Sequence, residues 1–466
     1  MGISRRTLLV GAGAGAVAVV LAACTPEPAP TRTPTPTPST PGPIPVDAVP
    51  APTAFLRSTW STDPYARGAM SYLPVGATPQ HRADLAAPVQ NRVFLAGETT
   101  DRDHPGTAPG AIADGRRAAA AVIAASTGGE RIAVVGAGVA GAAAARMLVD
   151  AGRTVTVLEA RERTGGRIQS VVDKNWPIPA QLGAWLSAPH DTDALDGVLA
   201  AQGIHRVSFG TPTGWSKDGA APSVDAGPIT KAVAQAANAP GDIALDAALK
   251  AAGANPEDPA LASALAWLQA TTGVDAAKAS SWYPPVFAPD ALVGADGDLG
   301  VLVDDALKGV KVTLASPVIR VAYDASGVSL RLGTGESLSF DRVIVTVPLG
   351  ALQHNAIEFA PPLPFPHRTA ITALGSGYAE TVWLRFDSVF WNVDADLWHV
   401  VGGDGPIRTW LNLQPVTGAP VLVGLVGGPE AEAFAKLSDG DAEATARSSL
   451  RYFVAATASP SPSPTP

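Results

Sequence analysis

The residues with the clearest chemical signature in this 466-residue chain are three glycines and one acid. Gly136, Gly138 and Gly141 stand in the run Gly-Ala-Gly-Val-Ala-Gly, and Glu159 follows Gly141 by 18 residues. The first glycine permits a tight turn, the second lets the backbone approach a diphosphate, and the third lets a helix pack closely on a strand. The acid is spaced to accept hydrogen bonds from ribose hydroxyls. This spacing predicts a dinucleotide-binding loop.

The segments around this loop have the pattern that such a loop requires. Residues 131–135 form a short apolar, β-branched run, which predicts a buried parallel strand. An alanine-rich helix is expected from the loop to about Ala151, and residues 154–158 predict a second strand that ends at Glu159. The helix would offer its free N–H groups to the phosphates. Strand, loop, helix and strand together predict an α/β fold with a Rossmann-like domain.

A second glycine turn follows the acid. In residues 159–168, Gly165, Gly166 and Arg167 come six to eight residues after Glu159. This segment resembles the flavin-binding motif of the FAD-dependent amine oxidase superfamily. The resemblance implies that these three residues close around the diphosphate of FAD, with Arg161 beside the adenosine part. It favours FAD over NAD as the cofactor.

Motifs that the same family has near its end here precede the dinucleotide loop. Residues 91–100 resemble its strand with an Ala-Gly-Glu triplet, which ends in Gly97 and Glu98. Residues 106–117, including Thr107, resemble its closing helix, and residues 60–72 resemble its Trp-x-x-Asp-Pro segment. The implied cofactor-binding residues are Gly136, Gly138, Val139, Ala140, Gly141, Glu159, Ala160, Arg161, Gly165, Gly166, Arg167, Gly97, Glu98 and Thr107. Each motif occurs once, so we interpret the order as a circular permutation, which places the segments near Phe55 and Tyr452 side by side.

The substrate side departs from the family pattern. Thr381 stands where many members carry a lysine near the flavin, and Met70 and Thr107 stand where monoamine oxidases have two cage tyrosines. These three residues are our candidates for the catalytic cavity. Ala69 occupies the position of the cysteine that bonds to flavin, so the resemblance implies non-covalent FAD. Trp185, Trp383 and Trp410 are further candidates for the cavity wall, although core packing explains a tryptophan equally well.

Composition argues against a nucleic-acid partner and against a metal site. The net charge is −9, with 33 Lys and Arg against 42 Asp and Glu, which argues against a nucleic-acid partner. The single cysteine and the scattered histidines argue against a metal site. The expected partner is a small-molecule substrate, an amine.

The N-terminus predicts export and anchoring. Paired Arg5 and Arg6 precede an apolar stretch of sixteen residues, Leu8 to Ala23. This stretch is shorter than the roughly 20 residues of a spanning helix, so it indicates a signal peptide. The paired arginines resemble a twin-arginine signal, and Cys24 resembles the lipidated cysteine of a bacterial lipobox. We expect a protein lipid-anchored at Cys24 on the outer face of the bacterial cell membrane; a plain signal peptide is the alternative.

The expected division of the chain follows from these motifs. A signal peptide, 1–24, and a Pro/Thr-rich linker, 25–53, come first. The FAD-binding domain consists of its permuted end, 54–126, the dinucleotide fold, 130–188, and a return segment, 293–350. The substrate domain consists of a helical part, 189–292, and a strand part, 351–458, and a Ser/Pro tail, 459–466, follows.

The expected function is FAD-dependent oxidation of an amine, by hydride transfer to flavin, with oxygen as acceptor. Two alternatives stay open: a desaturase-like flavin oxidoreductase acting on an apolar substrate, and a flavin-binding surface lipoprotein without turnover.

Replacing the paired arginines tests the export signal. In the Arg5→Lys, Arg6→Lys double variant, we expect the protein to stay in the cytoplasm, because the twin-arginine route requires both guanidinium groups. Cell fractionation followed by immunoblotting measures this. Normal export of the double variant would contradict the signal assignment.

Overall fold

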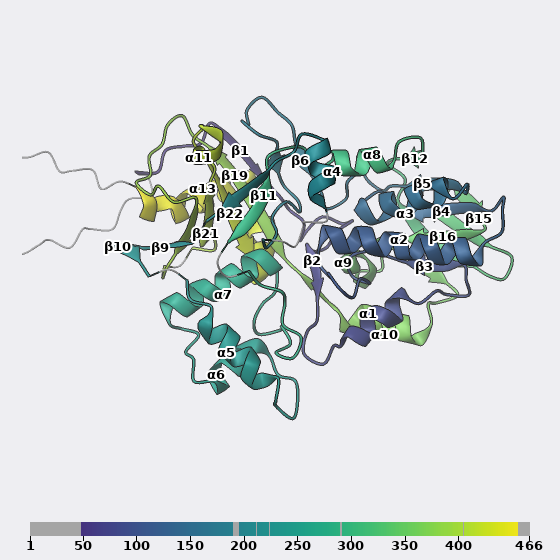
Figure 1. Ribbon diagram of the computed structural model, residues 1–466, viewed down its shortest axis with the longest axis horizontal. Helices are drawn as coiled ribbons and strands as arrows, with labels where there is room; N and C mark the ends of the chain where they lie inside the picture. The colour runs from purple at the N-terminus through teal and green to yellow at the C-terminus, as the bar shows by residue number, and fades with distance from the viewer. Residues whose placement is uncertain are drawn as a thin grey trace, which may run out of the picture. The chain divides into compact units, whose positions relative to one another are not determined.

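A five-stranded parallel sheet holds the dinucleotide loop at its carboxyl edge (Figure 1). The computed structural model describes residues 48–189, 195–210, 212–222, 224–288, 291–403 and 405–454. The predicted signal peptide, Cys24, most of the linker and the Ser/Pro tail lie outside the described residues. The strand order is β12 (Lys311–Thr313), β5 (Thr154–Leu158), β4 (Arg131–Val135), β16 (Arg342–Val345) and β3 (Val93–Leu95). The α/β fold with a Rossmann-like domain, predicted from the sequence, is therefore confirmed.

Two layers cover this sheet. Helices α2 (Ala108–Ala125) and α3 (Val139–Asp150) pack on one face through a cluster of alanines and β-branched residues. The second face packs on a four-stranded sheet of β15 (Ser337–Phe340), β14 (Val328–Leu332), β13 (Val318–Tyr323) and β17 (Glu358–Ala360). Apolar residues alternate along β14, which is buried on the side that faces the parallel sheet.

The chain builds the parallel sheet from segments that are far apart in sequence. Strand β3 precedes the dinucleotide loop and pairs with β16, about 250 residues later, with Val93 opposite Val343. Strand β16 in turn pairs with β4, which leads into the loop. The loop and the 91–100 motif therefore lie on the same edge of one sheet.

A seven-stranded sheet forms the second part of the structure. Its order is β1 (Ala54–Arg57), β19 (Ala379–Arg385), β22 (Val421–Gly427), β21 (Thr409–Asn412), β20 (Leu397–Val400), β9 (Thr213–Ser216) and β10 (Gly219–Ala221). Helix α7 (Pro259–Thr272) packs on one face, and α12 (Gly428–Ala435) and α13 (Asp439–Leu450) pack on the other. The segment 54–126 thus contributes β1 to this sheet and β3 to the parallel sheet.

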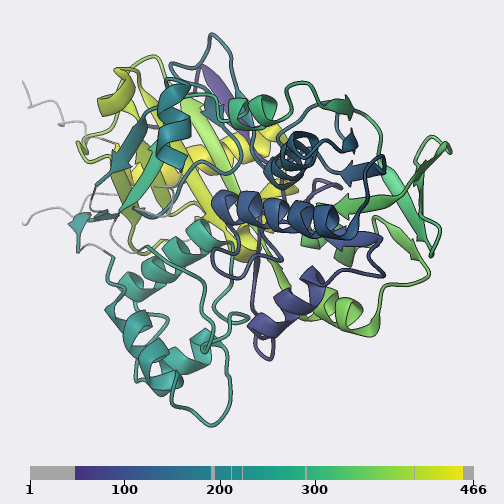
Figure 2. The ribbon, with the colours of Figure 1, turned by 45° about the vertical axis from the view of Figure 1, so that its right-hand side comes forward.

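The remaining elements connect the two sheets or lie at their edges. Two-stranded sheets join β11 (Leu292–Ala295) with β8 (Arg206–Phe209), β18 (Gly375–Gly377) with β2 (Met70–Tyr72), and β6 (Ser170–Val171) with β7 (Ala180–Gln181). The other helices are α1 (Pro79–Ala86), α4 (Asp196–Ala201), α5 (Gly227–Ala236), α6 (Leu245–Ala251), α8 (Val301–Ala306), α9 (Leu349–Gln353), α10 (Phe365–Ala373) and α11 (Gln414–Thr417), with a 3₁₀ turn at Arg451–Phe453. Figure 2 shows α5 and α6, in teal, grouped away from both sheets.

The two ends of the described chain adjoin each other. Val49 and Phe453 belong to the same apolar cluster, against which Phe55 and Tyr452 also pack. The Arg447 guanidinium donates to the Val49 carbonyl at 2.6 Å. The segments near Phe55 and Tyr452 therefore lie together, as the sequence predicts. Within the described ranges, no helix has the length and apolar character to cross a membrane.

One arginine fastens the connection between α2 and β4. The Arg342 Nε donates to Glu130 at 2.7 Å, and the guanidinium also donates to the carbonyls of Ala125 and Asn91. The hydrogen bond from Arg342 lowers the pKa of Glu130, despite the opposing effect of burial. The end of α2 and the starts of β3, β4 and β16 are thus held by a single side chain.

Removing this guanidinium should destabilise the fold. We expect Arg342→Met to lower the free energy of unfolding by about 3 kcal/mol, because it leaves a partly buried carboxylate without its partner. Chemical denaturation measures the change. Arg331→Met, at an exposed position of β14, is the control and should have little effect. Equal stability of the two variants would contradict this role of Arg342.

Candidate active site

The glycine loop joins β4 to α3 without side chains that would obstruct it. Gly136 has φ 107°, and a Cβ there would lie 2.5 Å from the Thr346 Oγ1. A Cβ at Gly141 would lie 2.0 Å from the Gly136 carbonyl oxygen. Gly138 is the N-cap residue of α3, and no side chain among the described residues caps this helix. The first turn of α3 therefore keeps N–H groups available to an anion.

A second glycine turn lies directly against the first. The Gly165 N–H donates to the Ala137 carbonyl at 2.9 Å, and Gly138 and Gly165 form a parallel bridge. Gly165 and Gly166 both have positive φ, 95° and 59°. A Cβ at Gly166 would approach the Gly138 Cα to 3.2 Å, so the two backbones meet closely.

The cavity beside these loops fits a dinucleotide. At Gly138 a Cβ would come no closer than 3.8 Å to other protein atoms, so packing does not require glycine there; a side chain would instead narrow the cradle. Residues of both loops line the cavity, together with Glu159. The donor set is that of a phosphate site: backbone N–H groups, a helix N-terminus and Arg167.

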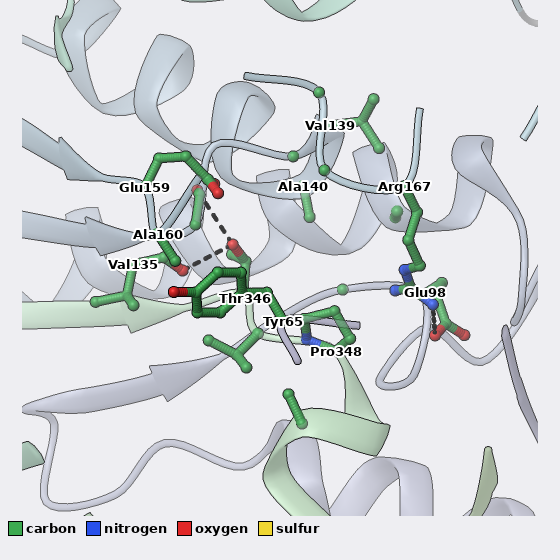
Figure 3. A pocket seen from close by; sticks show the side chains of 18 of the residues that line it. Tyr65, Glu98, Val135, Val139, Ala140, Glu159, Ala160, Arg167, Thr346 and Pro348 are labelled. Atoms are coloured by element: carbon green, nitrogen blue, oxygen red, sulfur yellow. Dashed lines mark hydrogen bonds and ion pairs between the residues drawn. The ribbon is translucent and has the colours of Figure 1, made fainter. Parts of the chain in front are cut away.

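Glu159 closes one side of this cavity (Figure 3). It stands just after β5, buried, and its Oε2 accepts from the Ala137 N–H at 2.8 Å. Its Oε1 accepts from the Arg161 N–H at 2.9 Å. Each carboxylate oxygen keeps a second lone pair for a ligand hydroxyl. The Arg161 guanidinium pairs with Asp63 at 2.8 Å.

An ion pair lies on the other side of the cavity (Figure 3). Glu98 is buried; it accepts from Arg167 at 3.0 Å and from the Ser71 hydroxyl and the Gly106 N–H. Burial alone would raise the pKa of Glu98, but the charge of Arg167 and the hydrogen bond from Ser71 outweigh it, and the pKa is lowered. Glu98 is therefore an ionised acid that fixes Arg167.

A second cavity, of about 380 Å³, adjoins the first. We call their shared wall the seam; it consists of Ala69, Gly106, Thr107, Ala108, Arg167, Ile168 and Ala184. Helix α2 begins here, with Thr107 as its N-cap. The two cavities therefore meet at the seam.

Sequence comparisons identify the family. A model described as flavin containing amine oxidoreductase matches residues 41–123 and 234–464, and a model of an NAD(P)-binding Rossmann-like domain matches residues 134–200. This chain belongs to the flavin containing amine oxidoreductase family. It is an FAD-dependent amine oxidoreductase.

Similar proteins agree with this assignment. The chain is 30% identical over 346 residues to "Polyamine oxidase 4" of Oryza sativa subsp. japonica, covering 66% of this chain and 70% of that one. It is 30% identical over 348 residues to "Probable polyamine oxidase 4" of Arabidopsis thaliana, covering 67% and 69%. A putrescine oxidase bound to putrescine matches with a TM-score of 0.55 and 20% identity, covering 70% of this chain and 82% of that one. Cyclohexylamine oxidase from Brevibacterium oxydans IH-35A matches with 0.54 and 20%, covering 70% and 81%. The two structures share the fold.

The structure brings the predicted flavin residues together. Of the expected cofactor-binding residues, those that line the first cavity are Gly136, Gly138, Val139, Ala140, Glu159, Ala160, Arg161, Gly165, Gly166, Arg167, Gly97, Glu98 and Thr107. Gly141 instead packs α3 against the loop, as its close approach to Gly136 shows. Within the described ranges, no group of three His, Cys, Asp or Glu side chains could hold a metal ion.

Of the three predicted catalytic residues, one belongs to the seam and two line the second cavity. Thr107 is part of the seam, but its hydroxyl accepts from the Gly110 N–H and donates to the His104 carbonyl, as a helix cap. Met70 and Thr381 line the second cavity. The Thr381 N–H donates to the Ser58 hydroxyl at 2.9 Å.

The three tryptophan candidates separate into two groups. Trp185 lines the second cavity, whereas Trp383 and Trp410 are fully buried and do not belong to its described lining. The Trp383 Nε1 donates to the Gln181 carbonyl, and its ring packs on Trp185 at 5.5 Å. Core packing therefore accounts for Trp383 and Trp410.

Sequence reasoning missed two buried charged residues, Glu380 and Arg82. Glu380 lies on β19 and accepts four hydrogen bonds, two from Ser61 and one each from Ser58 and Trp60. Burial raises its pKa despite these bonds. Arg82 donates to the Ser71 hydroxyl and the Thr99 carbonyl. Glu380 could have been predicted as a buried acid, because it is the single acid in a mostly apolar strand. The sequence of α1 is mostly polar, so nothing in it marked Arg82 as buried.

Gly138→Ala tests whether the glycine loop at 136–141 binds the diphosphate of FAD. The backbone of Gly138 (φ −78°) accepts alanine, so we expect the unfolding free energy of the apoprotein to change by less than about 1 kcal/mol. The added methyl group occupies the cradle, so FAD should bind at least about tenfold more weakly. Fluorescence titration of FAD into the apoprotein measures this. Gly197→Ala, on the surface of α4 with no atom within 4 Å of the added Cβ, is the control. Unchanged FAD affinity in Gly138→Ala would argue against a diphosphate at this loop.

Proposed function

We propose that this enzyme oxidises an amine held in the second cavity, with FAD bound non-covalently in the first and oxygen as the final acceptor. The observation that carries the proposal is the seam, because it joins a dinucleotide cavity to a separate, largely apolar one. The amine loses two electrons and two protons, and its C–N bond becomes a C=N bond. Oxygen finally takes up both electrons and both protons as hydrogen peroxide. FAD supplies the acceptor for the electron pair of the breaking C–H bond.

The side chains position these two molecules and exclude water. Backbone N–H groups of the glycine loops and the start of α3 would hold the diphosphate, and Glu159 the ribose. Arg167, fixed by Glu98, would place a positive charge at the seam. The N-terminus of α2 points its partial positive charge at the same place and would stabilise developing negative charge there.

The residue at position 381 bears on the electron acceptor. Thr381 lines the second cavity but carries no charge. Reaction with oxygen would therefore proceed without the help of an ammonium group at position 381. It would depend on whether oxygen can reach the seam. The names of the relatives make polyamines, putrescine and cyclohexylamine candidate substrates.

We also propose that the chain is a circular permutant of this family. Three observations support it: β3 completes the sheet beside β16, the two ends of the described chain adjoin, and the short connection at 126–130 links α2 to β4. On this proposal, 54–126, 130–188 and 293–350 supply the FAD-binding part, with β1 reaching into the large sheet. Segments 189–292 and 351–458 supply the substrate part.

The cellular location is part of the proposal. Arg5 and Arg6, the apolar stretch after them and Cys24 support twin-arginine export and lipid anchoring on the outer face of the membrane. Twin-arginine export suits a protein that must bind its cofactor before it crosses the membrane. The Pro/Thr-rich residues 25–53 would serve as an extended spacer.

Blocking the seam tests the proposed reaction. We expect amines to bleach the visible flavin band of the FAD-loaded protein under anaerobic conditions, and admitted oxygen to restore it with one peroxide per amine. Ala184→Phe should slow the bleaching at least about 100-fold, because it separates the two cavities and displaces the reacting carbon. Ala200→Phe, on the exposed side of α4, is the control. Bleaching by dithionite but by no amine would contradict the proposal.

A further inference from the structure

We propose that Arg82 is a positioning residue of the flavin site. It acts through Ser71 and Glu98 to hold the Arg167 guanidinium at the seam, and it thereby raises the reduction potential of the bound FAD. The inference rests on the placement of FAD in the first cavity, which is part of the proposed function. Its basis is the chain of hydrogen bonds that joins these four residues.

Arg82 joins two segments that carry residues of the site. It lies on α1, is only 3% exposed and lines the second cavity. Its Nη1 donates to the Ser71 hydroxyl and to the Thr99 carbonyl, both at 2.7 Å. Ser71 belongs to β2, and Thr99 directly follows Glu98. One guanidinium group therefore ties the segment around Glu98 to the strand beside it.

The hydrogen bonds from Arg82 to Glu98 run in one direction. A guanidinium group has donors and no acceptor, so the Ser71 oxygen accepts from Arg82. The Ser71 hydroxyl donates its own proton to the Glu98 Oε2, at 2.6 Å. A charged donor at one end and a carboxylate at the other polarise the hydroxyl between them, so each bond strengthens its neighbour. The Ser71 hydroxyl is thus a fixed link between two charged side chains.

Glu98 transmits this constraint to Arg167. Its Oε2 accepts from Ser71 and from the Gly106 N–H at 3.1 Å, and its Oε1 accepts from the Arg167 Nη1 at 3.0 Å. The same Nη1 donates to the Ala69 carbonyl at 2.7 Å. Figure 3 shows Arg167 and Glu98 facing each other at one side of the first cavity. These contacts hold the guanidinium against the seam.

The charge of Arg82 helps to keep Glu98 ionised. Burial opposes ionisation, but the charge of Arg167, the hydrogen bond from Ser71 and the charge of Arg82 outweigh it, so the pKa of Glu98 is lowered. Burial lowers the pKa of Arg82, while the charges of Glu98 and Asp101 oppose this effect. A guanidinium group nevertheless stays protonated in proteins. Arg82 is therefore a permanent positive charge beside the site.

A fixed positive charge at the seam favours reduced FAD over oxidised FAD. Reduction adds two electrons to the cofactor, and positive groups that are already in place stabilise the added negative charge. Without Arg82, the buried network has one positive charge less, and Glu98 holds Arg167 less firmly. Both changes weaken the binding of reduced FAD more than that of oxidised FAD. The ratio of these two affinities sets the reduction potential of the bound cofactor.

A potential titration of the FAD-loaded protein against a reference dye measures this ratio without any amine. We expect Arg82→Met to change it about tenfold in favour of oxidised FAD. For a two-electron couple, this lowers the potential by about 30 mV. Arg82→Lys keeps the charge and should change the ratio by less than about twofold. Arg102→Met is the matched control: it removes an exposed arginine close to Asp101, whose charge water and salt screen, and should leave the potential unchanged.

Ser71→Ala tests the route by which Arg82 acts. It removes the linking hydroxyl but keeps the Arg82 charge, so we expect a change of about threefold in the same direction. Combined with Arg82→Met, it should add nothing further, because both substitutions break the same chain. Additive changes would overturn the route through Ser71.

A purely structural role of Arg82 predicts a different result. Arg82→Met would then be less stable but would keep the wild-type potential, which would overturn the inference and leave the proposed function standing. If Arg82→Met does not fold, a wild-type potential in Ser71→Ala would overturn it equally. If the wild-type protein binds no FAD, the proposed function fails too.

Discussion

The close contact between two glycine loops is the constraint on which the rest of the active site depends. Gly138 and Gly165 meet backbone to backbone at the edge of the parallel sheet. The Gly165 N–H donates to the Ala137 carbonyl, so the second turn lies against the first and, with the start of α3, lines one narrow cavity. The positions of Glu159 after β5 and of Arg167 after the second turn both follow from this contact. The backbone contact between the two loops therefore shapes one wall of the first cavity.

Two buried acids on either side of the seam behave differently because of their partners. Glu98 has the Arg167 guanidinium beside it, and its pKa is lowered. Glu380 receives hydrogen bonds only from hydroxyls and backbone N–H groups among the described residues, and its pKa is raised. The pKa values of the two acids therefore shift in opposite directions, because a guanidinium group lies beside Glu98 whereas burial dominates at Glu380.

The order of segments along the chain matters less to this fold than their final contacts. Strands β3 and β16 pair although about 250 residues separate them, because hydrogen bonds and apolar burial depend on position in space. Arg342 supports the connection at this corner, because its guanidinium donates to Glu130 and to the Ala125 carbonyl. Residues 126–130 are long enough to link α2 to β4, because α2 ends at the edge of the sheet where β4 begins.

The sequence by itself predicted most of the residues that line the first cavity, because their arrangement depends on local spacing. The glycines, Glu159 and Arg167 are close in sequence, and apolar runs fixed their strands; Gly97 and Glu98 were recognisable as a further motif. Only the tertiary structure decided which residues line the second cavity. Glu380 and Arg82 come from segments about 300 residues apart, and Trp383 proved to be core because its neighbours come from other elements. Burial and the net charge of a cavity arise from the packing of distant segments, which no local pattern records.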